Sequence, residues 1–116
     1  MTDDEARALL GRAGELVVAA IGPGGWPVAT LAPGRLDDGG ILVDVAGDDV
    51  VAGSLVDGAA VCCVADEAPS YFEIKGVIAR GRVAGVRSDG DVLRAGVRVE
   101  RVVSFDFAKL PEASPS

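Results

Sequence analysis

Apolar residues recur at helical spacing near the start of the chain, before the pattern changes to short apolar runs. Thr2 stands three residues before Glu5, which is the spacing of a capping box at a helix start. The residues that follow at helical intervals are Ala6, Leu9, Leu10 and Ala13. This pattern predicts a helix over residues 3–12, with Gly14 placed to end it.

The short apolar runs that follow are rich in valine and are separated by turn sequences, which is typical of strands. They predict strands at residues 16–21, 28–36, 41–46 and 60–65. Glycine and proline fill the first gap, at 22–25, where only φ-permissive residues turn the chain cheaply. The sequence DDGG at 37–40 predicts a hairpin that pairs the second and third strands antiparallel.

Residues 48–57 read DDVVAGSLVD and contain three acids but no lysine or arginine. An acidic start suits a helix N-terminus, Val51 and Leu55 lie one helical turn apart, and Gly58 stands where a helix often ends. We therefore expect a short helix between the third and fourth strands. Gly53 weakens it by about 1 kcal/mol relative to alanine.

The longest strand pattern covers residues 71–86, and its apolar residues change face partway along. Phe72, Ile74 and Ile78 share one parity, whereas Val77, Ala79 and Val83 share the other. A bulge or sharp bend near Gly76 or Gly81 explains the change, because an extra residue lets one strand serve two faces of a closed sheet. Barrels use such bends at their corners.

The last part of the chain predicts a turn at 88–91, at most one helical turn at 91–96, and a sixth strand at 97–107. Arg101 is the exception on the apolar face of that strand. The length supports one domain, expected at 1–110. The remainder, 111–116, is expected to be a disordered tail because it is rich in proline and serine.

The net charge of −7 argues against binding to nucleic acid or to an anionic membrane, which both attract clustered lysine and arginine. The charge is uneven. Residues 1–70 hold twelve acids and three bases, whereas 71–116 hold six acids and eight bases. Any pocket for an anion should therefore use the second part of the chain.

Catalysis by side chains alone is poorly supported, and we expect no catalytic or metal-binding residues. The absence of histidine removes serine–histidine and cysteine–histidine mechanisms and most zinc sites. Cys62 and Cys63 are strand neighbours that point to opposite faces and are read as core thiols. The acidic N-terminus and the lack of a long apolar run predict a cytoplasmic protein. Chemistry must therefore come from a bound cofactor.

Three segments, in this order, resemble the FMN-binding split β-barrel family of pyridoxamine 5'-phosphate oxidase. They are GWPVAT after the first strand, KGVIARGRV in the fifth, and RVVSFDFAKL, which is similar to the closing strand of many short actinobacterial members. The resemblance covers residues 16–110. It implies a mainly β fold, a six-stranded antiparallel split β-barrel with a short N-terminal helix and a short helix between strands 3 and 4.

The resemblance also implies a homodimer with a flavin, either FMN or the deazaflavin F420, at the subunit interface against the second and third strands. The contacts that it implies there are Thr30, Ala32 and Val45. In the family the short helix carries basic residues that bind phosphate, but Val51 and Gly53 occupy those positions here.

Backbone amides of Gly47, Asp48 and Asp49 remain as phosphate donors, although the carboxylates would repel the phosphate. Compensating cations must then come from elsewhere. The candidates are Arg35, Lys75, Arg80 and Arg82, with Arg98 or Arg101 of the partner subunit. For any single arginine the alternative is a solvated barrel exterior. Trp26 and Tyr71 are candidates to cover the flavin ring, or else core or interface aromatics.

Two functions remain open on the sequence. The first is a pyridoxamine 5'-phosphate oxidase-like flavin-binding protein, acting as a small FMN- or F420-dependent oxidoreductase. Vitamin B6 oxidation itself is not expected, because the chain is short and lacks the C-terminal substrate-binding extension of that enzyme. The second is a degenerate split-barrel dimer that has lost the flavin and serves as a binding or structural module.

Overall fold

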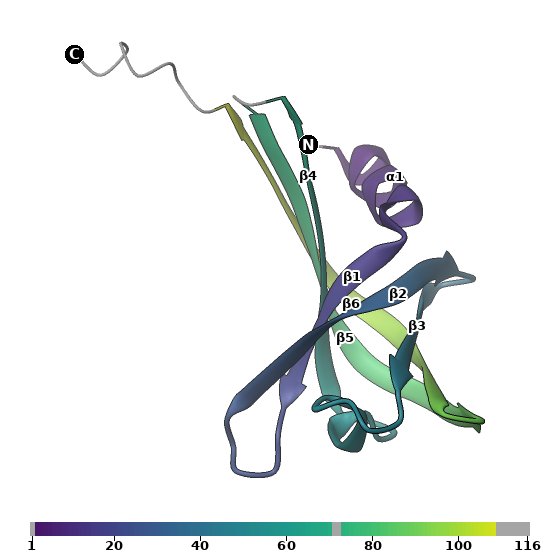
Figure 1. Ribbon diagram of the computed structural model, residues 1–116. Helices are drawn as coiled ribbons and strands as arrows, with labels where there is room; N and C mark the ends of the chain where they lie inside the picture. The colour runs from purple at the N-terminus through teal and green to yellow at the C-terminus, as the bar shows by residue number, and fades with distance from the viewer. Residues whose placement is uncertain (1, 71–72, 109–116) are drawn as a thin grey trace.

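The computed structural model describes residues 2–70 and 73–108 (Figure 1). It contains one α-helix, one short 3-10 helix and six strands within these ranges. Their order is α1 Asp3–Ala13, β1 Glu15–Ile21, β2 Pro27–Asp37, β3 Gly40–Ala46, η1 Ala52–Ser54, β4 Ala60–Ser70, β5 Glu73–Asp89 and β6 Val92–Ala108. The predicted mainly β fold with an N-terminal helix is confirmed.

The six strands form a closed antiparallel barrel in the order β1, β2, β3, β6, β5, β4. Hairpins join β1 to β2, β2 to β3, and β5 to β6. Gly39 and Gly90 supply the positive φ that these tight turns require, at 77° and 62°. β4, β5 and β6 extend beyond the barrel body on the side of α1, as Figure 1 shows.

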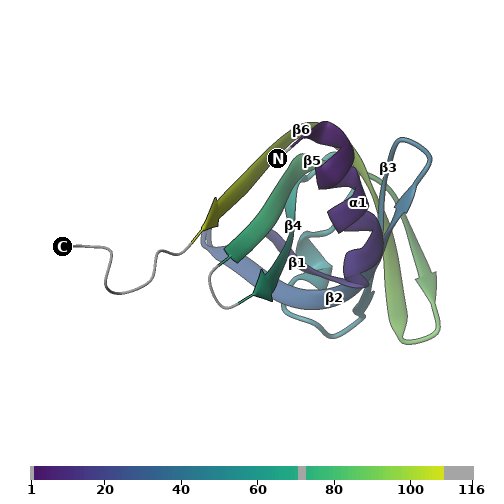
Figure 2. The ribbon, with the colours of Figure 1, turned by 90° about the horizontal axis from the view of Figure 1, so that it is seen from above.

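Helix α1 lies across one end of the barrel (Figure 2). The predicted capping box is present, since the Thr2 hydroxyl accepts from the Glu5 amide at 3.2 Å and Glu5 bonds back to the Thr2 amide. Gly14 ends the helix with a φ of 73°. The apolar side of α1 is buried against the barrel through Ala6, Leu9 and Leu10. The helix therefore closes this end.

The core follows from strand alternation, because every second side chain of a barrel strand points inward. Val18, Val43 and Val77 are fully buried inside the barrel. On β1 and β3 the intervening residues face outward and are half-buried or exposed. The core is aliphatic, and among the described residues no polar side chain is buried in it.

The bulge expected near Gly76 or Gly81 occurs at Gly81, but the extra residue belongs to the neighbouring strand. Arg80 pairs with Arg101 and Gly81 pairs with Val99, which leaves Glu100 unpaired on β6. A side chain at position 81 would press on the Arg98 carbonyl oxygen, so glycine allows the two backbones to approach. The bulge changes the inward parity of β6, which explains why Val97 is buried but Val103 is partly exposed.

Two expected boundaries differ from the structure. Residues 92–96, expected to form at most a helical turn, belong to β6, because each pairs with β3 and most also pair with β5. β4, predicted to end at residue 65, continues to Ser70. Tyr71, Phe72 and the predicted tail at 111–116 lie outside the described residues.

Candidate functional site

The acidic segment after β3 closes the second end of the barrel. Its only helical part is the three-residue η1, so the helix expected within 48–57 is reduced to one 3-10 turn. Val51 and Leu55 are nevertheless buried, as their spacing predicts, and join the core cluster. This segment thus plugs the barrel with two apolar side chains.

Asp49 fastens this segment to β2. Its Oδ2 atom accepts from the Thr30 hydroxyl at 2.8 Å, and its Oδ1 atom accepts from the Val51 amide at 2.9 Å. Thr30 and Asp49, both candidates for contact with a flavin, therefore bind each other. Nearby, Asp57 accepts from the Gly85 amide at 2.7 Å. Two of the three acids in this segment hold the fold together.

The backbone amides considered as phosphate donors are largely engaged as well. The Gly47 amide donates to the Asp91 carbonyl at 2.7 Å, and the Asp49 amide donates to the Ala46 carbonyl at 2.9 Å. A phosphate would have to displace these bonds and also approach the carboxylates of Asp48 and Asp49. The segment does not offer the open helix N-terminus that a bound anion requires.

Three other candidates from β2 and β3 lie on different sides of the sheet. Ala32 and Val45 are buried in the core, so their side chains face away from any ligand outside the barrel. Arg35 is exposed on the outer side. Lys75 lies on β5, where its backbone register partners are Glu67 of β4 and Asp106 of β6. The eight predicted site residues are thus not gathered in one group.

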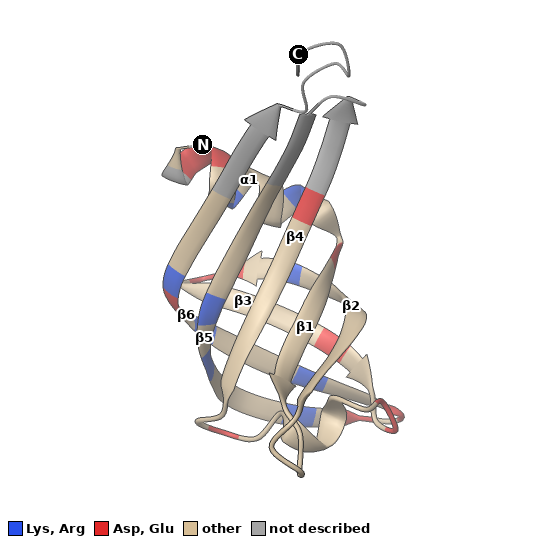
Figure 3. Cartoon of the chain, turned by 90° about the vertical axis from the view of Figure 1, so that its left-hand side faces the viewer, with Lys and Arg blue, Asp and Glu red and all other residues tan. Residues whose placement is uncertain are grey.

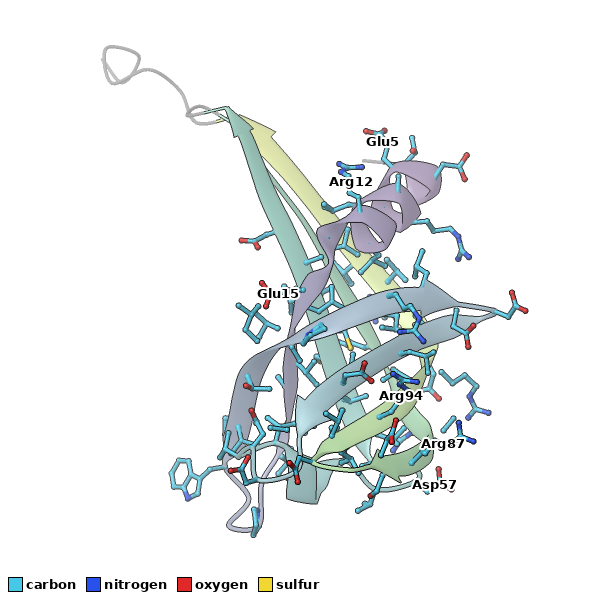
Figure 4. The ribbon with its side chains drawn as sticks, turned by 45° about the vertical axis from the view of Figure 1, so that its right-hand side comes forward. Glu5, Arg12, Glu15, Asp57, Arg87 and Arg94 are labelled. Atoms are coloured by element: carbon cyan, nitrogen blue, oxygen red, sulfur yellow. The ribbon has the colours of Figure 1, made fainter. Side chains whose placement is uncertain are left out.

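An ion pair on the outer side of β3 and β6 joins Asp44 to Arg94. Arg94 donates from Nε to Asp44 Oδ1 at 2.7 Å and from Nη2 to Oδ2 at 3.2 Å. This hydrogen bonding, together with the charges of Arg94 and then Arg35, lowers the pKa of Asp44 despite partial desolvation. Figure 4 shows Arg94 and Arg87 on the side of the molecule opposite Glu15.

On the side of the barrel away from Arg94, the outer face carries a continuous row of apolar residues. No pattern along the sequence predicted this row. Each member is the register partner of the next, so the row crosses five adjacent strands. Its residues are Leu31, Val17, Val64, Ile78 and Val103. Leu31 is 62% exposed, and Val17 and Val103 are each 38% exposed. In Figure 3, β1 and β4 are free of charged residues over most of their length on this side.

The next row along the same strands changes from small residues to arginines. It runs through Ala29, Ala19, Cys62, Arg80 and Arg101 in matching register. A shallow groove of about 440 Å³ lies beside it, lined by Ala19, Ile21, Cys62, Arg80, Arg82 and Glu100 among others. Figure 3 shows the basic segments on the adjacent β5 and β6. The groove is therefore apolar on β1 and cationic on β5.

The two cysteines differ in environment although they are neighbours. Cys63 is buried in the core, and burial, with a smaller effect from Cys62, raises the pKa of its thiol to about 12. Cys62 is half-buried on the outer face, so only one of the two expected core thiols lies in the core.

Trp26, a candidate to cover a flavin ring, is 76% exposed in the turn before β2.

Solved structures share this fold over nearly the whole chain. An FAD-binding protein from Mycobacterium smegmatis superposes with a TM-score of 0.76 at 14% identity, covering 92% of this chain and 98% of that one. An F420 reductase gives 0.71 at 12% identity, covering 88% and 98%. A provisionally assigned pyridoxamine 5'-phosphate oxidase from Corynebacterium glutamicum gives 0.73 at 13% identity, covering 96% and 94%. The predicted split-barrel fold is confirmed.

The sequence itself gives no such match. No protein-family model matches the chain, and no curated protein sequence is significantly similar to it. At these identities the structural likeness establishes the fold alone. Among the described residues, no helix combines the length and the apolar character needed to cross a membrane.

Proposed function

We propose that this protein binds a flavin-type cofactor, FMN or F420, and acts as a small homodimeric oxidoreductase. The observation that carries the proposal is the whole-chain likeness in fold to proteins described as an FAD-binding protein and an F420 reductase. Because fold does not determine function, the proposal also has to fit the residues present in this chain.

A phosphorylated ligand would meet more suitable residues on the outer face of β5 than at the segment after β3. That segment has carboxylates, no cation, and amides that already donate within the chain. The groove beside Arg80 combines apolar walls with guanidinium groups, and its volume of about 440 Å³ falls in the usual range for ligand pockets. A bound flavin supplies the redox chemistry, while the chain binds and orients it.

The homodimer is proposed through the apolar row of Leu31, Val17, Val64, Ile78 and Val103. A two-fold interface places the same patch of both subunits face to face, so it must be self-complementary. An uncharged row that crosses five strands meets this requirement, because burying it against its copy leaves no charge unpaired. The arginines of the adjacent row then lie at the edge of the interface.

A flavin-free barrel is the second candidate, and one observation favours it. The segment from Gly47 to Leu55 is closed on itself by the Asp49 carboxylate and by its own turns. In this version the chain keeps the barrel and the dimer as a structural or binding module without redox activity.

Visible absorption of the freshly purified protein, followed by titration with FMN and F420, separates the two candidates. The first predicts flavin absorption bands or saturable quenching of flavin fluorescence at micromolar concentration. A colourless protein that quenches neither cofactor would overturn it. The same protein denatured by urea serves as the control, because quenching that persists there does not come from the folded barrel.

A further inference from the structure

Three pairs of arginines face each other directly across the hairpin of β5 and β6. The register opposes Arg80 to Arg101, Arg82 to Arg98, and Arg87 to Arg94. Residues directly opposed in an antiparallel pair share a face, and like charges at such positions destabilise the sheet. Each of the three pairs therefore needs a compensating partner, although the chain as a whole has a net charge of −7.

Two of the three pairs are compensated by acids of the same chain. Arg94 is bound by Asp44 through two hydrogen bonds. Arg82 and Arg98 lie 3.9 and 4.0 Å from the two oxygens of Glu100, the unpaired bulge residue. Arg82 also donates to the Gly58 carbonyl at 3.1 Å. Each of these pairs has a carboxylate that offsets part of the repulsion.

The third pair has no such partner. Neither Arg80 nor Arg101 forms a hydrogen bond or an ion pair within the described part of the chain, and both are exposed. Glu100 precedes Arg101 in the sequence, but the ion pairs that it makes are with Arg82 and Arg98. The outer face around this pair therefore has an excess of positive charge, from four arginines and one carboxylate: Arg80, Arg82, Arg98, Arg101 and Glu100. Arg80 also lines the apolar groove.

We propose that Arg80 and Arg101 together bind the phosphate end of the ligand, while the groove beside Ala19 and Ile21 holds its apolar part. Two guanidinium groups on adjacent strands can donate to the same phosphate, which is the geometry for which arginine is suited. A bound dianion would also remove the repulsion between them. This inference rests on the proposed function for the identity of the ligand, and moves its phosphate from the segment after β3 to β5 and β6.

The anion site is tested without a flavin by titrating the protein with pyrophosphate and recording the side-chain Nε–Hε NMR signals of arginine. We expect saturable shifts at Arg80 and Arg101, and a loss of affinity of about tenfold or more in Arg80→Gln and Arg101→Gln, as expected for one charged hydrogen-bonding partner. The matched control is Arg87→Gln, which removes an equal charge from the same strand and should leave the affinity unchanged. Absent shifts, or an equal effect of Arg87→Gln, would overturn the inference.

A second variant separates binding from folding. Arg101→Glu replaces the like-charged pair by an opposite-charged one, so the fold should become slightly more stable while pyrophosphate binding is lost. Loss of binding together with unfolding would argue for a structural role instead.

A further titration compares the affinity for FMN with the affinity for riboflavin, which lacks the phosphate. The ratio of their affinities should fall in Arg80→Gln but not in Arg87→Gln. If FMN binds and this ratio stays constant, the site is wrong and the proposed function stands. If pyrophosphate binds at the pair and no flavin binds, the site stands and the proposed function fails.

Discussion

Asp49 uses both carboxylate oxygens to hold the plug of the barrel in place, one on Thr30 and one on Val51. Thr30 is a candidate flavin contact on the family resemblance, and Asp49 is a candidate phosphate donor through its backbone amide. Their mutual bond joins residues 19 positions apart, and it arises only after β2 and the segment beyond β3 are brought together. Two of the three acids in 48–57, Asp49 and Asp57, therefore have a structural use within the chain.

The Asp44 and Arg94 pair predicts a specific dependence of stability on pH. The pKa of Asp44 is lower in the folded protein than its ordinary value of 3.8, so the stability that it contributes is complete above that value. This contribution is lost as the pH falls through the lower, folded pKa. We expect the wild-type protein to exceed Asp44→Asn in free energy of unfolding by a constant amount above about pH 5, and by progressively less below pH 3.8.

Urea denaturation at a series of pH values measures this difference. Arg94→Gln removes the partner instead of the acid and should reduce the same pH dependence. A difference between wild type and Asp44→Asn that grows toward low pH would contradict the assignment of the ion pair.

The buried thiol of Cys63 should be inert in the folded protein. Its pKa of about 12 and its position in the core keep it protonated and inaccessible. In a Cys62→Ala variant, which has one thiol, alkylation at about pH 8.5, near the ordinary thiol pKa, should be negligible until denaturant is added. Mass spectrometry measures the adduct, and rapid labelling without denaturant would show that β4 is not packed as described.

At the scale of elements, local sequence signals identified most of the architecture. The capping box of α1 and the turn at DDGG act within a few residues, so their outcome is independent of distant contacts. Residues 92–96 were misassigned because no local signal shows that both neighbours of β6 supply hydrogen-bonding partners. The change of apolar face along residues 71–86 predicts a bulge near Gly76 or Gly81, but the unpaired residue on β6 depends on cross-strand register.

The close approach at Gly81 should make this bulge sensitive to a single methyl group. Gly81→Ala directs a Cβ against the Arg98 carbonyl oxygen, and we expect a loss of about 1–3 kcal/mol in unfolding free energy, as for other overpacked sites. Gly53→Ala is the matched control, since nothing lies near its Cβ and it should be neutral or stabilising. Thermal denaturation of both variants measures this, and equal melting temperatures would refute the tight contact.

At the scale of the whole molecule, the candidate site is made of residues that no local pattern connects. The apolar row draws one residue from each of five strands, spread from position 17 to position 103. Sequence analysis singled out Arg80 and the charge bias of the second part of the chain, but it could not pair Arg80 with Arg101 in one subunit. That pairing depends on the register after the bulge at Glu100.

The proposed dimer is tested by placing a charge in the apolar row. Leu31→Glu should convert a dimer into a monomer, because the two-fold axis brings two copies of the new charge into one apolar interface. Val50→Glu is the matched control, since Val50 is also 62% exposed but lies in the segment after β3. Sedimentation measures the mass, with circular dichroism to verify the fold. A wild-type monomer, or a Leu31→Glu dimer, would contradict the proposed interface.

Cys62 and Cys63 place the same chemical group on the two sides of one strand, so the natural sequence contains a two-sided reporter. The inner thiol senses only the opening of the barrel. The outer thiol lies opposite Arg80 and lines the groove, so its labelling rate registers whatever covers that surface. The ratio of the two rates, measured on unmodified protein in a cell extract, reports occupancy of the outer face separately from unfolding, without a tag and before any ligand has been identified.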